Sequence, residues 1–139
     1  MFLRKTIMAA ALAGLTASPV LADNFLVHIT TDNPTTAALG FLVALTAQNA
    51  GNHVDVFLAG DGASLITDTA ISSVTGVGTG KLADHFSALV KGDAQIYISG
   101  MSAKARNIGD ADIAGKPAQF AMPAKLVELA AAADVVLVY

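Results

Sequence analysis

The chain of 139 residues contains no cysteine and no tryptophan, and only 14% of its residues are charged. Without cysteine it can form no disulfide framework, thiolate nucleophile or cysteine-based metal site, and thiol redox chemistry is excluded. Stability must therefore come from an apolar core or from assembly. The low charge content and the 54% of hydrophobic residues also exclude an intrinsically disordered chain.

Residues 1–22 are predicted to be a signal peptide. Arg4 and Lys5 give a positively charged start, an apolar run extends over 6–17, and Val20-Leu21-Ala22 supplies small residues at a cleavage site. We expect cleavage after this tripeptide and hence a periplasmic or secreted protein. Because the apolar run is shorter than the roughly 20 residues that span a bilayer, a retained membrane anchor is the weaker interpretation.

The remaining part, residues 23–139, has the size of one compact domain. It contains 6 basic and 11 acidic residues, which gives a net charge of about −5. This balance argues against nucleic-acid binding, which requires a clustered basic face. No second long apolar run follows in the sequence, so we expect no membrane association after the signal peptide is removed.

Strand-like and helix-like segments alternate along this domain. Strands are predicted at 25–30, 52–59, 94–98, 119–121 and 135–139. Helices are predicted from Pro34, capped by Asn33, to about 50, then over 81–90 and 123–133, with shorter ones within 63–71 and at 103–107. We expect an exposed loop at 72–80 and mainly irregular chain at 109–121. The pattern predicts an α/β fold with a mainly parallel five-stranded sheet and helices on both faces.

Glycines and small polar residues gather where three of the predicted strands end. In open α/β sheets, ligands bind beyond the carboxyl ends of the strands, so these turns form the candidate ligand site. The alternative is that Gly and Asp are present only because they form turns well. The candidate residues are Thr31, Asp32, Gly60, Asp61, Gly62, Ser99, Gly100, Met101, Ser102 and Lys104. We predict no catalytic residue, no metal ligand and no cofactor.

The segment that begins at Gly100 resembles two functional patterns in part. A helix start followed by Lys104 and Arg106 favours an anion, but these cations lie about 200° apart on a helix, so a solvated helix capped by Ser102 is the preferred interpretation. The segment also approaches the G-x-S-x-G elbow of serine hydrolases. Lys104 replaces the final glycine, and no histidine lies downstream of the serine, which argues against a hydrolase.

Two further patterns fall short of known functional motifs. Gly76–Lys81 resembles a phosphate loop but lacks its first glycine and the Ser or Thr that binds magnesium, so we interpret it as a flexible loop. His28, His53 and His85 show no metal-ligand spacing, and His28, inside a strand, is expected to be a hydrogen-bonded core residue. A metal site assembled from distant histidines and aspartates is left open.

Three segments share their order and spacing with one known family. They are FLVHITTDNPTTAALGFLVALTAQNAGNHVDVFLAGDGASLI at 25–66, AQIYISGMSAKARNI at 94–108 and AKLVELAAAADVVLVY at 124–139. In these segments the chain resembles the DsrE/DsrF-like family, and the likeness covers nearly all of residues 23–139. The resemblance implies a Rossmann-like α/β sandwich that assembles into homotrimers or hexamers.

The resemblance also carries an expectation about chemistry. Active members of that family relay sulfur as a cysteine persulfide, and the resemblance maps their cysteine onto Ser99. A serine hydroxyl stays protonated at neutral pH and carries no sulfane sulfur, and the thioether of nearby Met101 accepts none either. Sulfur transfer by this chain alone is therefore excluded.

Three functions remain open from the sequence. The first is non-catalytic binding of a small anion or sulfur-containing metabolite at the strand-end turns. The second is assembly, as a homo-oligomer or as a partner subunit of a cysteine-bearing relative, suggested by the helix that is apolar nearly all round at 37–47. A weak enzyme that uses Ser99 or Ser102 as nucleophile, or Asp32 and Asp61 as an acid–base pair, ranks last.

Overall fold

A computed structural model describes residues 20–139, so nearly all of the predicted signal peptide lies outside the described residues. Five strands form one sheet in the order β6-β5-β2-β1-β7, and all four neighbouring pairs are parallel. This confirms the parallel α/β sheet predicted from the sequence. The strands are β1 (Asn24–Ile29), β2 (His53–Leu58), β5 (Gln95–Ser99), β6 (Ala118–Ala121) and β7 (Val135–Val138).

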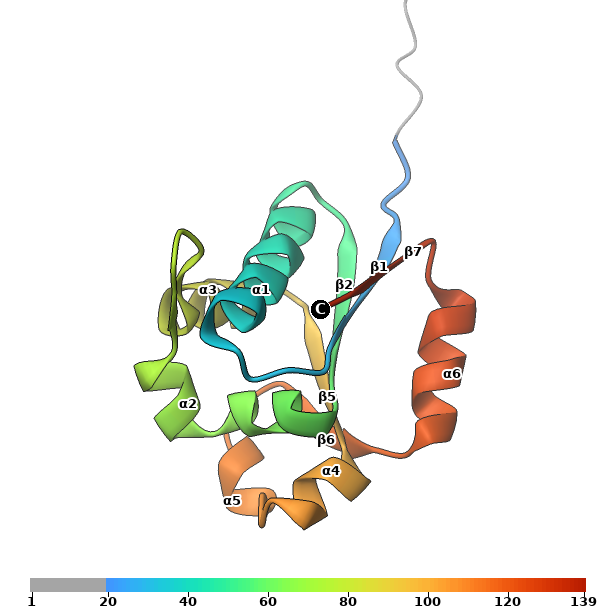
Figure 1. The fold of residues 1–139 in the computed structure, drawn as a ribbon. Coiled ribbons are helices and arrows are strands. Elements are labelled where there is room, and N and C mark those ends of the chain that lie inside the picture. The colour runs from blue at the N-terminus through green and yellow to red at the C-terminus, as the bar shows by residue number, and fades with distance from the viewer. Residues whose placement is uncertain (1–19) are drawn as a thin grey trace, which may run out of the picture.

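Helices cover both faces of this sheet, as Figure 1 shows. On one face α1 (Pro34–Asn49) packs against α3 (Leu82–Val90), and the other face carries α6 (Pro123–Ala132). The predicted start of α1 is confirmed, because the Asn33 side chain accepts hydrogen bonds from the backbone N–H groups of Thr35 and Thr36. No helix among residues 20–139 has both the length and the apolar character that crossing a membrane requires.

The two faces of the sheet are buried to different extents. The larger core lies under α1 and α3, where Phe41, Leu89 and Ile96 are fully buried. The smaller core, under α6, consists of Leu26, Phe57, Tyr97 and Ala121, with Leu126 and Leu129 packed against it from α6. No residue of α6 is fully buried. The face under α6 is therefore thinly covered and leaves space for polar side chains.

The chain between β2 and α3 is more ordered than predicted. It contains a 3-10 helix η1 (Gly60–Ile66), α2 (Asp68–Ser73) and a hairpin of β3 (Thr75–Gly76) and β4 (Gly80–Lys81). Most of residues 72–80 are exposed, as expected, but the short hairpin was not predicted. The hairpin lies against the start of α1, where the Val77 N–H donates to the Thr35 hydroxyl at 3.1 Å and Gly76 is buried.

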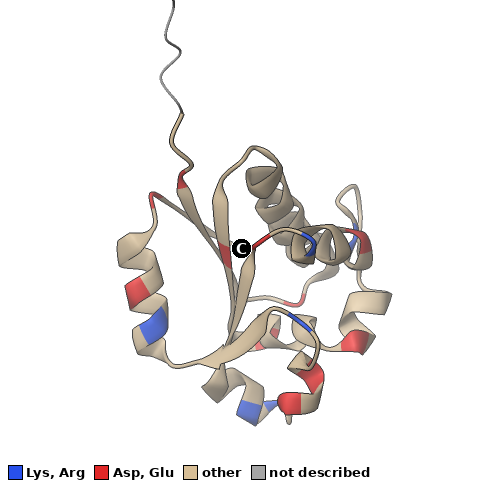
Figure 2. Cartoon of the chain, turned by 180° about the vertical axis from the view of Figure 1, so that it is seen from behind, with Lys and Arg blue, Asp and Glu red and all other residues tan. Residues whose placement is uncertain are grey.

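Two boundaries in the second half also differ from the prediction. Helix α4 (Gly100–Ala105) begins three residues earlier than expected, because Ser99 rather than Ser102 is its N-cap. The segment expected to be mainly irregular contains α5 (Asp110–Ile113) before β6. In Figure 2 the basic residues are spread over several elements of the described chain rather than gathered on one face.

Candidate functional site

The carboxyl ends of β1, β2 and β5 lie together at one edge of the sheet, which we call the carboxyl rim (residues 30–32, 60–62 and 99–102). The Ala59 N–H donates to the Ile29 carbonyl at 3.0 Å, and the Gly60 N–H donates to the Ser102 hydroxyl at 2.9 Å. Asp61 forms an ion pair with Arg106, which immediately follows α4. The structure thus brings the turns after β1, β2 and β5 together.

The two glycines of the central turn allow this close approach. Gly60 has a φ of +55°, which favours glycine, and a Cβ there would lie 3.1 Å from the Thr30 carbonyl oxygen. A Cβ on Gly62 would collide with the carbonyl oxygen of Ile29. Both glycines therefore have a structural role, which is to let η1 pack against the end of β1.

The two serines of the rim are engaged by backbone groups. The Ser99 hydroxyl accepts from the Ser102 N–H at 3.3 Å and caps α4, and the Ser102 hydroxyl accepts from the Gly60 N–H. In the described part of the chain, neither hydroxyl is hydrogen-bonded to a histidine or carboxylate side chain. The arrangement therefore offers no general base for either serine.

The cation that faces the rim is Arg106, which the candidate list omitted, and not Lys104. The guanidinium of Arg106 pairs with Asp61 and donates to the Ser102 carbonyl at 3.2 Å, whereas Lys104 is exposed. The helical spacing of these two residues indicated that only one could face the turns. It did not say which, because that depends on where α4 begins.

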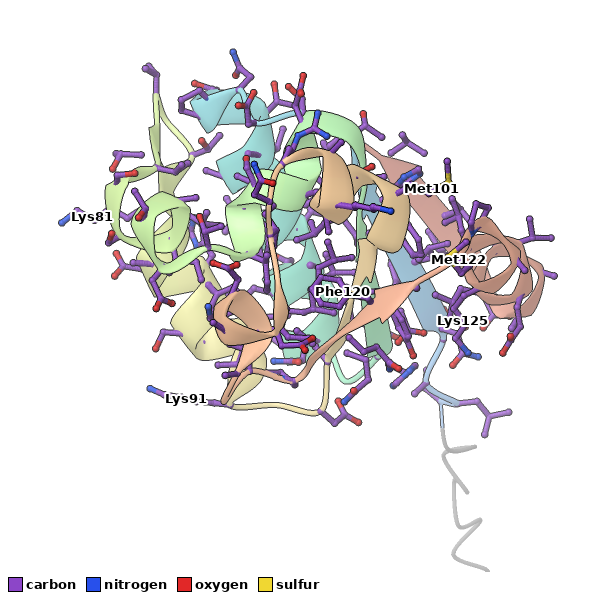
Figure 3. The ribbon with its side chains drawn as sticks, turned by 90° about the horizontal axis from the view of Figure 1, so that it is seen from below. Lys81, Lys91, Met101, Phe120, Met122 and Lys125 are labelled. Carbon is purple, nitrogen blue, oxygen red and sulfur yellow. The ribbon has the colours of Figure 1, made fainter. Side chains whose placement is uncertain are left out.

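The remaining candidates of the rim lie in the turn after β1 and at the start of α4. The Thr31 hydroxyl accepts from the Asn33 N–H at 3.1 Å and shapes the turn into α1, while the Asp32 side chain is exposed. Gly100 lies close to Met122, because a Cβ there would be 3.9 Å from the Met122 sulfur. Met101 is 64% exposed, and Figure 3 shows it at the same side of the molecule as Met122.

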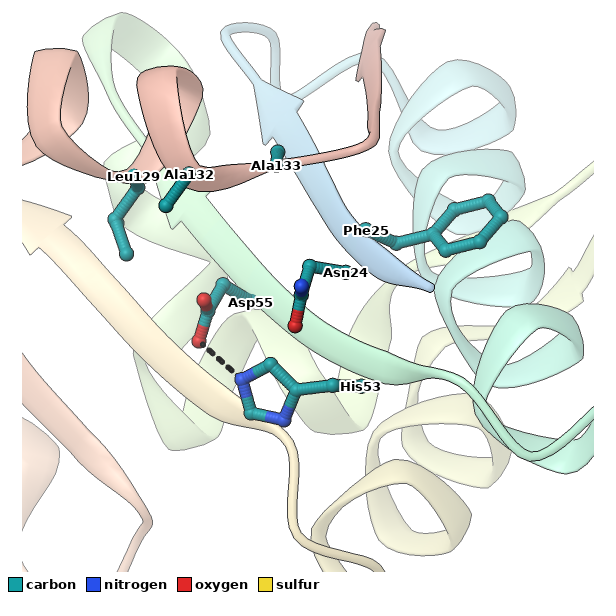
Figure 4. Close-up of a pocket in the computed structure, with 7 residues that line it drawn as sticks. All are labelled: Asn24, Phe25, His53, Asp55, Leu129, Ala132 and Ala133. Atoms are coloured by element: carbon teal, nitrogen blue, oxygen red, sulfur yellow. Dashed lines mark ion pairs between the residues drawn. The ribbon is translucent and has the colours of Figure 1, made fainter. Parts of the chain in front are cut away.

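A cavity of about 230 Å³ lies at the opposite end of the sheet, where β1 and β2 begin beneath the last turn of α6. We call it the amino-end cavity (Figure 4). None of its residues was among the sequence candidates, because alternating polar residues at the start of a strand resemble an ordinary solvated strand end. The lining residues are Asn24, Phe25, His53, Asp55, Leu129, Ala132 and Ala133.

Asp55 is the most enclosed ionisable group of this cavity. Its side chain is 16% exposed, and its carboxylate lies 3.5 Å from Nε2 of His53, whose Nδ1 is 3.9 Å from Asp93. Burial raises the pKa of Asp55, although the attraction of His53 and Lys125 acts in the opposite direction. Among residues 20–139, no three His, Cys, Asp or Glu side chains are grouped as a metal site would require.

His28 differs from its sequence prediction. Its Nε2 is buried and has no hydrogen-bond partner, so the expectation of a hydrogen-bonded core histidine was wrong. The ring instead meets Phe57 edge to face at a centroid distance of 5.6 Å, and Phe57 in turn stacks on Tyr97. Burial lowers the pKa of His28, because the low-dielectric surroundings disfavour the charged ring.

Comparison with known proteins agrees with this architecture. Several solved structures share the fold. The ychN protein from E. coli has a TM-score of 0.66 at 13% identity, over 86% of this chain and 100% of that one. A conserved protein of unknown function from Bacteroides thetaiotaomicron has a TM-score of 0.64 at 16% identity, over 84% and 95%.

The sequence comparisons are more specific. No curated protein matches the chain. The model of the DsrE/DsrF-like family matches residues 24–139, a range that includes the carboxyl rim. The chain therefore belongs to the DsrE/DsrF-like family.

Proposed function

We propose that this chain is an exported, non-catalytic binding protein that holds a small anionic or sulfur-containing ligand at the carboxyl rim. The observation that supports this is the meeting of three strand-end turns around Ser99, the position to which the family resemblance assigns a cysteine. A rim of this kind without a sulfur nucleophile retains the means to bind but not to transfer. Export to the periplasm or the medium follows from the predicted signal peptide.

Arg106 is the group on which an anion would bind. Its guanidinium is held by the Ser102 carbonyl, so its position is fixed before any ligand arrives. Its present partner, Asp61, is 68% exposed, and exposed ion pairs contribute only about 0–1 kcal/mol. A ligand oxyanion can therefore replace Asp61 at little cost and gain bidentate hydrogen bonds from the guanidinium.

The experiment is a titration of the purified protein with sulfate, sulfite, thiosulfate and phosphate, followed by thermal unfolding and isothermal calorimetry. We expect saturable stabilisation by at least one of them, abolished in Arg106→Gln and in Ser99→Trp. Lys91→Gln removes an exposed cation elsewhere and serves as the matched control. A flat response to every anion, or binding unaffected by Arg106→Gln, would contradict the proposal.

A second candidate function is assembly with other protein chains. The sequence suggested α1 as the contact surface, but the exposed apolar side chains that favour assembly lie elsewhere. Helix α1 is largely covered, and among its large apolar residues only Leu39 reaches 37% exposure. Apart from Val20 and Leu21 and the scattered Val77, Met101 and Met122, the remaining exposed large apolar side chains are Val127 on α6 and Val136 and Val138 on β7, at 68%, 46% and 64%. A homotrimer, a hexamer or a complex with a cysteine-bearing relative would cover them.

Light scattering coupled to gel filtration tests this alternative. We expect a mass several times that of the monomer, and a monomer for the double variant Val136→Asp/Val138→Asp. Thr69→Asp, on the exposed surface of α2, introduces a charge on the opposite face as a control. A monomeric wild-type protein at micromolar concentration, also when mixed with a cysteine-bearing relative, would remove the assembly function.

A further inference from the structure

The amino-end cavity carries an inference that is independent of the rim. It lies at the other end of the parallel strands, and its residues take no part in the turns around Ser99. We propose that this cavity binds a small organic cation, a primary amine with a short apolar body, with the carboxylate of Asp55 as its counter-ion.

The pairing of β1 with β2 determines which side chains form the floor of the cavity. Asn24 of β1 lies opposite His53 of β2, and Leu26 lies opposite Asp55, so these side chains project from the same face of the sheet. Figure 4 shows His53 and Asp55 side by side beneath α6, while the ring of Phe25 points away. The polar floor therefore consists of one carboxylate, one imidazole and one amide.

The roof is apolar and small. Leu129, Ala132 and Ala133 line the cavity from the last turn of α6 and the residue that caps it. Small side chains on the helix leave the space open above Asp55, whereas Phe57 and Tyr97, further along the sheet, are packed beneath it. A cavity of about 150 Å³ accommodates benzene in another protein, so this one is large enough for a comparable apolar group and an amine.

The charges around the cavity favour a cation. Asp55 is its enclosed carboxylate, Asp93 lies on the far side of His53, and Asp134 accepts hydrogen bonds from Asn24. The carboxyl end of α6 also points its unpaired carbonyl groups and the negative end of its dipole at this region.

The nearby cation, Lys125, attracts the Asp55 carboxylate but is paired directly with a different carboxylate. Lys125 lies over the ring of Tyr97 and is hydrogen-bonded to Glu128 at 2.8 Å, so its charge already has a partner. His53 is 3.5 Å from Asp55 at the edge of the floor. An ammonium group inside the cavity would reach the carboxylate from the side that faces α6, and its apolar body would contact Leu129 and Ala132.

The test is a titration of the ¹⁵N-labelled protein with butylamine and benzylamine hydrochlorides near neutral pH, followed by NMR. Saturable shifts of Asn24, His53, Asp55 and Ala132 are expected, and 1-butanol and benzyl alcohol at equal concentrations should give much weaker ones. Asp55→Asn should reduce the affinity for the amines by at least about tenfold. Asparagine has nearly the same shape as aspartate but lacks the negative charge that accepts the ammonium hydrogen bond. Ala132→Leu, which narrows the cavity and keeps the carboxylate, should also weaken binding.

Two control variants make the result decisive. Asp84→Asn removes an exposed carboxylate on α3, across the sheet, and should bind the amines as the wild type does. Arg106→Gln should also leave amine binding unchanged, which separates this site from the rim. The inference is overturned if neither amine gives saturable shifts at the cavity, if the alcohols bind as well, or if Asp55→Asn and Ala132→Leu both bind normally.

Discussion

The backbone N–H of Gly60 donates a hydrogen bond to the hydroxyl of Ser102 at 2.9 Å, which joins the turn after β2 to helix α4. The two residues are 42 positions apart, and the Asp61–Arg106 pair lies beside them. This contact fixes the position of α4 relative to the central strand. The geometry of the carboxyl rim therefore depends in part on Ser102, whose hydroxyl accepts a hydrogen bond from a backbone N–H group.

Replacing this hydroxyl should lower stability modestly. Ser102→Ala leaves the Gly60 N–H to water, so we expect the free energy of unfolding to fall by about 0.5–1.5 kcal/mol. Chemical denaturation followed by circular dichroism measures the change. Ser87→Ala, at an exposed position of α3, is the matched control and should be neutral or slightly stabilising. Equal effects of the two substitutions would show that the contact contributes nothing.

The close approach of η1 to β1 gives a larger expected effect. In Gly62→Ala the new Cβ collides with the Ile29 carbonyl, and because that atom belongs to the backbone of a central strand, relief requires the strand or η1 to move. We expect a loss of about 1–3 kcal/mol or more. Gly109→Ala, where the added Cβ meets open space, should cost less than about 1 kcal/mol in the same unfolding experiment. A Gly62→Ala protein as stable as the Gly109→Ala protein would contradict the packing described.

Asp55 should leave a signature in the pH dependence of stability. Burial raises its pKa above the ordinary value of 3.8, so over an interval above that value the folded chain holds a proton that the unfolded chain has lost. This group therefore reduces stability as the pH rises above 3.8, through the interval between its unfolded and its folded pKa. The stability of Asp55→Asn relative to wild type should increase over that range, measured by urea unfolding at several pH values. A constant difference would show that the carboxyl has the same pKa in both states.

His28 should act in the opposite direction. Its lowered pKa means that the unfolded chain binds a proton more readily than the folded chain, so stability is lost as the pH falls through the ordinary value of 6.5. An NMR titration of the ring protons should place the pKa of His28 below that value. In His28→Leu the loss of stability over this range should be smaller than in the wild type. A His28 resonance that titrates at or above 6.5 would show that the ring is solvated.

The sequence predicted those parts of the fold that depend on local pattern. Alternating strands and helices indicated a parallel sheet, and Asn33 before Pro34 indicated the start of α1 correctly. The β3–β4 hairpin was missed because its order depends on contacts with Thr35, 42 residues away, rather than on its own Ser, Thr and Gly composition. The boundary of α4 was misplaced because Ser99 and Ser102 are equally good caps in isolation.

The two candidate sites differ in how far they could be predicted. Turns at the ends of parallel strands share an edge by topology, so Gly60 and Ser99 could be grouped without coordinates. The amino-end cavity could not be found in this way. His53 and Asp55 line one cavity only because small residues of α6 lie above them. The sequence does not indicate where that helix crosses the sheet.

The position of β1 in the sheet has a consequence for the route by which the protein folds. One of its neighbours is β2, close in sequence, but the other is β7, which the hydrogen bonds between Asn24 and Asp134 join across 110 residues. Until residues 134–138 are available, an inner strand presents an unpaired edge, and the slow closure of such a long loop delays the native state. A chain that ends before residue 134 would therefore leave the β7 side of β1 without its strand partner.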